Sequence, residues 1–409
     1  MPMTREAAPS TGARQPESIM GSGYPLAFKF RQGTERPPLV AQENARGVFV
    51  TEARQLARFG KEGVIHEGAN GSVWRLTTDE GKHFGADDVA PFPLGFFNAG
   101  LIGDLANRLL AIARVRGIAV DALEVDLDNP FWMQGSFVRG DAFSHADPAT
   151  IDLRLNSPAD AHTIRRLVDD AIKASPPMHG LRTQLKNTFA IYVNGRRRPV
   201  TSMDASTAPD AADPFQTYST PPAPLANSDQ FDDIITKTGK VHDGEVMRYP
   251  SGSKAKLVRH VIGNGRLIDP AGIMATECAL DMPGVSFFRY KTDERSHIEQ
   301  GPSGLALFSA AIAFCYMTQI ARFIEHQKLS IRGVRIVQHT PYMLTGSIAD
   351  GTWTGTQGPV DTHLFLSGDE TDETHERLMT TGATICFLHS ALRDANDPVV
   401  SIELNSNEI

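Results

Sequence analysis

The chain has 409 residues, of which 41% are hydrophobic and 22% are charged. This composition is that of a folded, water-soluble protein with material for more than one core, so it excludes a chain that is disordered throughout. The 40 basic and 48 acidic residues give a formal net charge of −8, which argues against nucleic-acid binding because affinity for phosphate needs a basic face.

The N-terminus and the cysteine content indicate the compartment. Residues 1–40 hold six prolines among small polar residues, which predicts a mobile tail without a signal peptide. The longest apolar stretch, Leu305–Tyr316, is too short to cross a bilayer and is typical of a buried core helix. The three cysteines, Cys278, Cys315 and Cys386, are too few for a secreted disulfide framework. We therefore expect a cytoplasmic protein that does not bind membranes.

The first folded segment is predicted to span residues 41–200. Its expected elements are, in chain order, a strand at Val73–Glu80, a long apolar helix beginning at Pro91, a strand over Val120–Val125 and a strand at Thr150–Leu155. Ser157 is the expected N-cap of a second helix, with Pro158 as its first residue.

A polar tract rich in Pro, Ser and Thr predicts an interdomain linker over residues 201–240, and a second folded segment follows over 241–409. In that segment, Val258–Ile268 alternates around Gly263-Asn264-Gly265, which predicts a hairpin. The elements expected after it are a strand at Ser286–Glu294, an apolar helix beginning at Pro302, a strand over Ile331–Ile336, a strand at His363–Leu366 and a helix beginning near Thr371.

The two segments carry the same pattern. Pro91–Val125 aligns without a gap to Pro302–Ile336. A strand that ends in Thr-Asp-Glu precedes each long helix. The period, which runs from Pro91 to Pro302, is far too long for a solenoid repeat and predicts a duplicated domain of the α+β class.

The repeat places two thiols at matched positions. Cys315 falls inside the second apolar helix, and Cys386 follows the last helix. The first copy has Asp104 and Ser175 at these two positions, with the same spacing along the chain. A single cysteine in an apolar helix is often inert core, whereas two thiols at repeat-matched positions favour a shared role.

The first copy cannot perform thiol chemistry at these positions. Asp104 is costly to bury unpaired, and Arg108 stands at the favourable i+4 position. A structural ion pair between them is one interpretation. The other is a remodelled pocket lined by Asp104, Ser175 and His179, with Asp104 as an acid or base.

The residues from Gly301-Pro302 to Cys315, with Asp-Glu before them and Cys386-Phe387-Leu388-His389 and Leu392 after them, form a recognisable motif. The motif resembles the OsmC/Ohr family of osmotically inducible and organic-hydroperoxide-resistance proteins. The first copy shows the same skeleton in Asp79-Glu80, Ala90 to Pro93 and Ser175-Pro176. The resemblance implies two fused OsmC-like domains, each a curved antiparallel sheet packed on a long central helix plus a second helix. Together they would form within one chain the dimer that relatives form from two.

The resemblance also implies a two-cysteine peroxidase. Cys315 would attack an organic hydroperoxide, Cys386 would close a disulfide, and a dithiol would reopen it. The family places a Glu nine residues before the attacking Cys to hold an activating Arg, but this chain has Ala306 there and Gly95 in the first copy. The activating cation is expected from Arg289 or Arg295, with Arg259 and Arg266 also available; His389 is a further candidate site residue.

Two other functions stay open from the sequence. One is a hydrolase or lyase that uses Cys315 as a covalent nucleophile, with His389 or Asp104 transferring the proton, on a small apolar substrate. The other is a binding protein that holds an apolar ligand between the central helices. The chain shows no phosphate-binding loop, dinucleotide fingerprint or metal-ligand spacing of histidines, so no cofactor and no metal are predicted.

Overall fold

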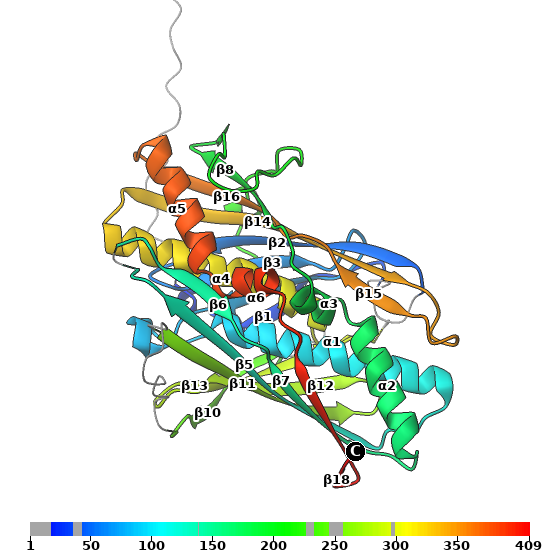
Figure 1. Ribbon diagram of the computed structural model, residues 1–409. Coiled ribbons are helices and arrows are strands. Elements are labelled where there is room, and N and C mark those ends of the chain that lie inside the picture. The colour runs from blue at the N-terminus through cyan, green and yellow to red at the C-terminus, as the bar shows by residue number, and fades with distance from the viewer. Residues whose placement is uncertain (1–17, 36–42, 138, 226–232, 245–256, 296–298) are drawn as a thin grey trace, which may run out of the picture.

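The computed structural model describes residues 18–35, 43–137, 139–225, 233–244, 257–295 and 299–409. These residues form two nine-stranded sheets and six α-helices. Two long helices lie side by side in the interior, with one sheet on each side of the pair (Figure 1). The class is therefore α+β, as the sequence predicts.

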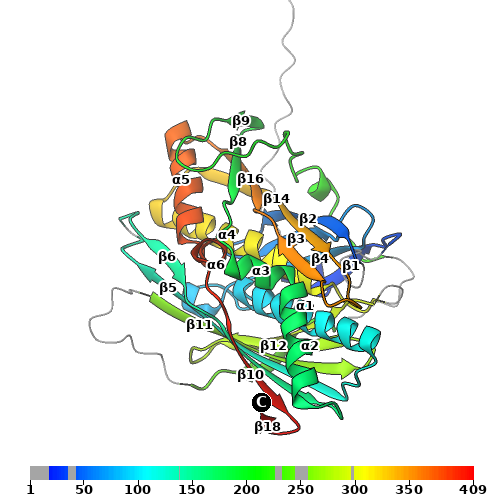
Figure 2. The ribbon, with the colours of Figure 1, turned by 45° about the vertical axis from the view of Figure 1, so that its right-hand side comes forward.

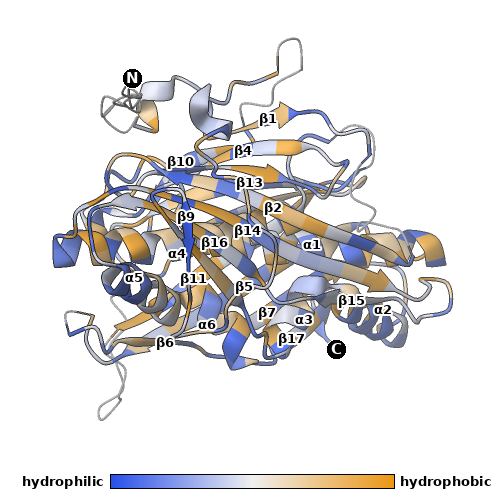
Figure 3. Ribbon diagram, turned by 90° about the horizontal axis from the view of Figure 1, so that it is seen from above, coloured by the Kyte–Doolittle hydropathy of each residue, from blue (hydrophilic) through white to orange (hydrophobic). Residues whose placement is uncertain are grey.

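The helices are α1 (Pro93–Arg116), α2 (Ala161–Ala174), α3 (Pro176–Arg182), α4 (Gly304–Gln327), α5 (Asp372–Ile385) and α6 (Phe387–Asp394). The first three helices are separated from their counterparts among the last three by one constant offset in residue number, which is the offset of the sequence repeat. Helices α2 and α5 carry hydrophilic residues on part of their surface (Figure 3).

Sheet A contains strands from both halves of the chain, in the order β1-β4-β3-β2-β14-β16-β8-β9, with β15 paired to β14. Their bounds are β1 (Ala27–Arg31), β2 (Ala45–Gln55), β3 (Lys61–His66), β4 (Val73–Thr78), β8 (Thr188–Val193), β9 (Arg196–Arg198), β14 (Ile331–Thr345), β15 (Thr354–Gln357) and β16 (Asp361–Gly368).

Sheet B repeats this arrangement in the order β10-β13-β12-β11-β5-β7-β17-β18, with β6 paired to β5. Its strands are β5 (Ala122–Gln134), β6 (Phe143–Ala146), β7 (Thr150–Asn156), β10 (Ile235–Val241), β11 (Leu257–Asp269), β12 (Ile273–Leu280), β13 (Ser286–Asp293), β17 (Val399–Leu404) and β18 (Asn407–Glu408). Figure 2 shows the C-terminal segment running down from α6 to β18 at the bottom of the view.

The two halves of the chain exchange strands. In sheet A, β2 pairs with β14 over ten residue pairs, and in sheet B, β11 pairs with β5 over ten. The pairings of β16 with β8 and of β17 with β7 are parallel, and the remaining pairings between described strands are antiparallel. Each sheet is therefore built by both halves.

The long helices run past each other in opposite directions. Phe96 packs on Phe314, with ring centroids 5.7 Å apart, and Phe97 stacks on Phe308 at 4.4 Å. A Cβ on Gly100 would lie 2.5 Å from the backbone nitrogen of Phe308, so only glycine permits this approach. Helix α4 is the one helix among the described residues that is long and apolar enough to cross a membrane, and its most apolar window is fully buried in the protein.

The hairpin expected around Gly263-Asn264-Gly265 is wrong. Strand β11 runs unbroken through these residues. The glycines instead leave room for Ile102 of α1, because a Cβ on Gly265 would lie 2.3 Å from Ile102 Cγ2. The glycines thus serve helix-to-sheet packing and not a turn.

The expected tail and linker are ordered in part. Within residues 1–40, β1 pairs with β4 in sheet A; residues 1–17 and 36–40 lie outside the described residues. Within 201–240, the ring of Tyr218 is buried under Arg54, and β10 already belongs to sheet B. Buried aromatic side chains and strand pairing thus extend both folded segments beyond the boundaries predicted from composition.

The second helix of the first copy starts later than predicted. Asp160 is the N-cap of α2, because its carboxylate accepts a hydrogen bond from the backbone N–H of Thr163. Ser157 donates to the carbonyl of Ala119 instead. In the second copy, the side chain of Thr371 caps α5 in the expected region.

Candidate active site

The fold brings Cys315 and Cys386 together. Cys315 lies midway along α4, and Cys386 lies between α5 and α6, where one helix ends and the next begins. Both are free thiols, 3% and 0% exposed, and their side chains hydrogen-bond to each other. The repeat-matched cysteines of the sequence therefore correspond to one thiol pair in the core.

Both sulfur atoms face the first turn of α6. The backbone N–H groups of Leu388 and His389 lie close enough to Cys315 and Cys386, respectively, to lower the pKa of each thiol. The N–H groups at a helix N-terminus carry partial positive charge and favour a thiolate. This turn therefore stabilises one negative charge shared by the two sulfurs.

The two thiols titrate as a pair, with one pKa lowered and the other raised. Burial raises the pKa of Cys315, and the neighbouring Cys386 and Glu80 raise it further. Burial alone would also raise the pKa of Cys386, but the hydrogen bond from the Cys315 thiol and the charge and hydrogen bonds of His389 outweigh it and hold that pKa well below its usual range. Loss of the first proton from the pair therefore leaves the thiolate on Cys386, and the Cys315 thiol donates a hydrogen bond to it.

His389 completes the thiol group. Its ring packs between Phe189 and Tyr316, with centroid distances of 5.4 and 5.3 Å. Within the described part of the chain, neither ring nitrogen has a hydrogen-bond partner, and the ring lies close enough to Cys386 to act on the pKa of that thiol. The imidazole thus lies beside the thiol pair. It also lines a cavity of about 710 Å³ on this side of the molecule.

Buried charges surround Cys315 on its other side. Lys61, at the start of β3, donates to the carbonyl of Phe59 at 2.6 Å and lies 3.8 Å from Glu80 Oε1. Thr318, one turn along α4 from Cys315, donates to the same carboxylate oxygen at 2.5 Å. Burial lowers the pKa of Lys61 and raises the pKa of Glu80, while each group's charge opposes the shift of the other.

A second cation, Arg322, lies further along α4. Its guanidinium is sandwiched between the rings of Phe84 and Phe137, 4.7 and 4.6 Å from their centroids. It interacts electrostatically with Glu80 and with Cys315. Positive charge from two residues is thus available to Cys315 in its thiolate form.

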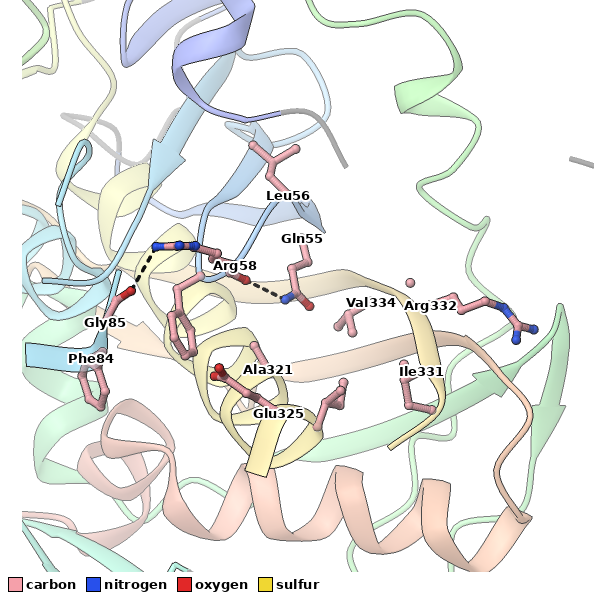
Figure 4. A pocket seen from close by; sticks show the side chains of 13 residues that line it. Gln55, Leu56, Arg58, Phe84, Gly85, Ala321, Glu325, Ile331, Arg332 and Val334 are labelled. Atoms are coloured by element: carbon pink, nitrogen blue, oxygen red, sulfur yellow. Dashed lines mark hydrogen bonds between the residues drawn. The ribbon is translucent and has the colours of Figure 1, made fainter. Parts of the chain in front are cut away.

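A small cavity reaches Cys315 from the surface. Its volume of about 30 Å³ has room for one or two water-sized groups. The lining residues are Glu80, His83, Phe84, Phe92, Pro93, Leu94, Arg259, Leu280, Cys315, Thr318, Gln319 and Phe387. Phe84 also lines a neighbouring cavity of about 560 Å³, where Arg58 donates to the carbonyl of Gly85 (Figure 4).

The expected arginines lie elsewhere. Arg289 binds Glu277 at 2.6 Å, Arg295 binds Asp293 at 2.7 Å, and Arg266 lies 3.6 Å from Glu124. Of the four arginines considered from the sequence, Arg259 is the one that lines the cavity at Cys315. Arg289, on β13, and Arg295, just after it, thus lie against carboxylates of sheet B and outside this lining.

The matched position in the first copy holds a polar network. Ser175 donates to Asp104 Oδ2 at 2.6 Å, and Arg108 donates to Asp104 Oδ1 at 2.8 Å. The guanidinium of Arg108 lies over the ring of Trp353. His179 is turned away: its Nδ1 accepts from the backbone of Gln357. Asp104 and Ser175 thus make the same contact as the two thiols, within a closed ion pair.

Sequence reasoning missed the buried charges at Cys315. Lys61, Glu80 and Arg322 have no motif of their own, and Lys61 and Glu80 come from the half of the chain opposite to the cysteines. The repeated Thr-Asp-Glu was the available signal for Glu80. A separate cluster, His339, Asp361 and His363, has the donor set of a metal site.

No protein-family model matches the chain, and no curated protein matches it. Among solved structures, the chain is similar to the crystal structure of an OsmC-like hydroperoxide resistance protein from Jannaschia sp. CCS1, with 20% sequence identity and a TM-score of 0.25. The match covers 36% of this chain and 95% of that protein.

Proposed function

We propose that the protein is a two-cysteine peroxidase that reduces organic hydroperoxides, built from two OsmC-like domains fused in one chain. The observation that carries the proposal is the contact between Cys315 and Cys386 at the first turn of α6, next to a cavity that reaches Cys315. A lone buried thiol would be inert core, whereas this pair holds the pKa of one thiol well below its usual range, which favours a thiolate.

The proposed reaction has three steps. The proton of Cys315 passes to the Cys386 thiolate, and the Cys315 thiolate attacks the terminal oxygen of the hydroperoxide. The O–O bond breaks, and Cys386 gives the proton to the departing alkoxide, which leaves as an alcohol. The thiolate of Cys386 then attacks the sulfur of the Cys315 sulfenic acid, forming the disulfide and releasing hydroxide, which a proton converts to water. A dithiol reduces the disulfide and is itself oxidised.

The walls of the cavity support an apolar substrate of this class. Four of its side chains are the rings of Phe84, Phe92 and Phe387 and the isobutyl group of Leu280. In the family, a Glu at the position of Ala306 holds the activating Arg. Here Glu80, with the cations Lys61 and Arg322, would supply the charges near Cys315 instead. With room for one or two water-sized groups, the cavity would take the peroxide oxygens at its polar end, and the organic group would lie outside it.

The exchanged strands support the fused arrangement. Each sheet combines strands from before one long helix with strands from after the other, and the helices repeat at the same offset as the sequence pattern. Lys61 and Glu80 from one half then serve Cys315 of the other half. The site would therefore be composite, as at the interface of a dimer.

The test is a peroxide titration of the reduced protein. One equivalent of cumene hydroperoxide is expected to produce a Cys315–Cys386 disulfide by peptide mass spectrometry and one equivalent of alcohol. Cys278→Ser is the matched control, because Cys278 is another fully buried thiol whose pKa is raised by burial, and it should react like the unaltered protein. A cumene hydroperoxide that is left intact, with Cys315 still a thiol, would overturn the proposal.

A hydrolase is the second candidate, favoured by the thiol–imidazole contact of Cys386 and His389. The two functions differ in what each cysteine does. In a peroxidase, Cys386→Ser should stop after one oxidation, with sulfenic acid trapped on Cys315 by dimedone. In a hydrolase that uses Cys386, the same variant should lose turnover, while Cys315→Ser keeps it.

A further inference from the structure

The outer face of sheet A carries two imidazoles and a carboxylate that converge. His339 lies on β14 and pairs directly with Asp361 on β16, and His363 follows two residues later, on the same face of its strand. One potential ligand atom from each of the three lies within 4.8 Å of the other two. Neighbouring strands thus bring together residues that the spacing along the chain keeps apart, and the expectation of no metal site rested on that spacing.

The imidazole of His363 lies between a tyrosine hydroxyl and a carboxylate. Tyr192 Oη lies 3.2 Å from Asp210 and 3.1 Å from His363 Nδ1. On the other side of the ring, His363 Nε2 lies 3.1 Å from Asp361 Oδ2, and a metal ion would take the place of the proton in this contact. Two metal–ligand bonds of about 2.0–2.1 Å at a tetrahedral angle hold their donor atoms about 3.3 Å apart, which is close to this separation.

The carboxylate and the second imidazole are prepared in the same way. Asp361 Oδ1 accepts from Thr188 at 2.7 Å, and Oδ2 accepts from Ser206 at 3.0 Å. The Nδ1 atom of His339 is buried with no hydrogen-bond partner in the described part of the chain, so no protein group competes with a metal ion for it. Oriented carboxylates and neutral imidazoles are what a metal ion requires.

We propose that His339, Asp361 and His363 bind a divalent transition metal of the zinc type on the outer face of sheet A. Two imidazoles and a carboxylate are the protein ligands of catalytic zinc sites, which keep a fourth position open. His339 lines a groove of about 1050 Å³ together with Glu52, His66 and Tyr342. His339 thus connects the proposed site to that groove.

The site would also fasten the segment between the two halves. Ser206 and Asp210, which orient the ligands, belong to residues 201–225, which cross the outer face of sheet A. A metal ion would link β14, β16 and this segment. This role does not depend on the thiol chemistry of the core, because Cys315 lies on the opposite, helix-facing side of the sheet.

Cobalt(II) titration of the untagged, metal-free protein tests the proposal. The expected result is one Co²⁺ per chain, with the visible absorption of a four- or five-coordinate nitrogen and oxygen site, displaced by one equivalent of Zn²⁺. His339→Ala, at a partly exposed position, and Asp361→Asn should each weaken binding at least about 10-fold. Binding should persist in the Cys315→Ser/Cys386→Ser variant, which separates it from metal capture by the thiols.

Two control variants locate the ion. His162→Ala removes an exposed histidine on α2 and should leave the affinity unchanged. His66→Ala removes the imidazole that pairs with Glu52 in the same groove and should have little effect. Unchanged affinity in His339→Ala and Asp361→Asn, loss of binding in His66→Ala, or no saturable binding by the parent protein would each overturn the proposal.

Discussion

At the scale of single residues, the chemistry at the core depends on which charges burial leaves next to the thiols. The sequence identified Cys315 and Cys386 because a thiol at two repeat-matched positions is rare. It could not identify Lys61 or Glu80, because each is an ordinary charged residue until strand exchange places it beside the other half's helix. Residue identity predicted the thiols, and long-range pairing alone determined their neighbours.

His83 gives this setting a measurable pH dependence. Burial and then the positive charges of Arg259 and Arg322 lower the pKa of His83 to about 4, against about 6.5 in the unfolded chain. The unfolded state therefore binds more protons between these values, so stability is lost as the pH falls from about 6.5 to 4. At pH 5 this loss is about 2 kcal/mol.

The measurement is urea unfolding at pH 7.5 and pH 5 for the protein and for His83→Gln. The variant should lose about 2 kcal/mol less than the parent between these two pH values, because it has no imidazole to protonate. His162→Gln, at an exposed position on α2, should lose as much as the parent. Equal losses in all three proteins would show that His83 titrates normally in the folded state.

At the scale of elements, helices were easier to predict from the sequence than strands. The long helices α1 and α4 begin within two residues of the positions expected from Pro91 and Pro302, because a continuous apolar face and a proline near the N-terminus are local signals. Strand β11 was misread as a hairpin, since Gly263 and Gly265 have the same local pattern whether they turn the chain or admit a helix. Only the contact with Ile102 distinguishes the two.

That contact predicts a coupled pair of substitutions. Gly265→Ala places a Cβ 2.3 Å from Ile102 Cγ2 and should destabilise the protein by about 1–3 kcal/mol. Ile102→Ala removes the clashing atom, at a cost of about 2–5 kcal/mol for the cavity. The double variant should lose less unfolding free energy than the sum of the two single losses, by about 0.5–3 kcal/mol in a double-mutant cycle from urea unfolding. Additive losses would mean that the strand shifts away from α1 instead.

At the scale of the whole molecule, the repeat predicted duplication, and the chain's own sheets show how the halves combine. Strands β2 and β14 pair across sheet A, and β5 and β11 pair across sheet B. Neither half alone contains a complete sheet, and the apolar faces of α1 and α4 are covered largely by each other and by the sheets. The offset between the two copies was visible in the sequence, but the exchange was not, because alternating strand patterns do not specify partners.

The exchange predicts that the halves fold only together. A fragment of residues 1–225 contains Lys61 and Glu80, and a fragment of residues 233–409 contains Cys315 and Cys386. In each fragment, one strand of each ten-pair contact between the halves has lost its partner, and one face of a long helix is uncovered. The loss of this packing costs more free energy than a domain's typical net stability of about 5–15 kcal/mol. Neither fragment should therefore unfold cooperatively as a monomer, as followed by near-ultraviolet circular dichroism.

Mixing the two fragments should restore the fold at a one-to-one ratio, and with it the buried setting of Cys315. Iodoacetamide reports whether the core thiols are buried. Cys278, which is fully buried in the whole protein, should react in the isolated 233–409 fragment and become protected in the mixture, where sheet B is complete. A self-association of either fragment would show as a different mass in light scattering and as failure to combine. If each fragment were instead a stable monomer, with the thiols of the 233–409 fragment protected, the halves would be independent domains, and Glu80 would have no part in the chemistry of Cys315.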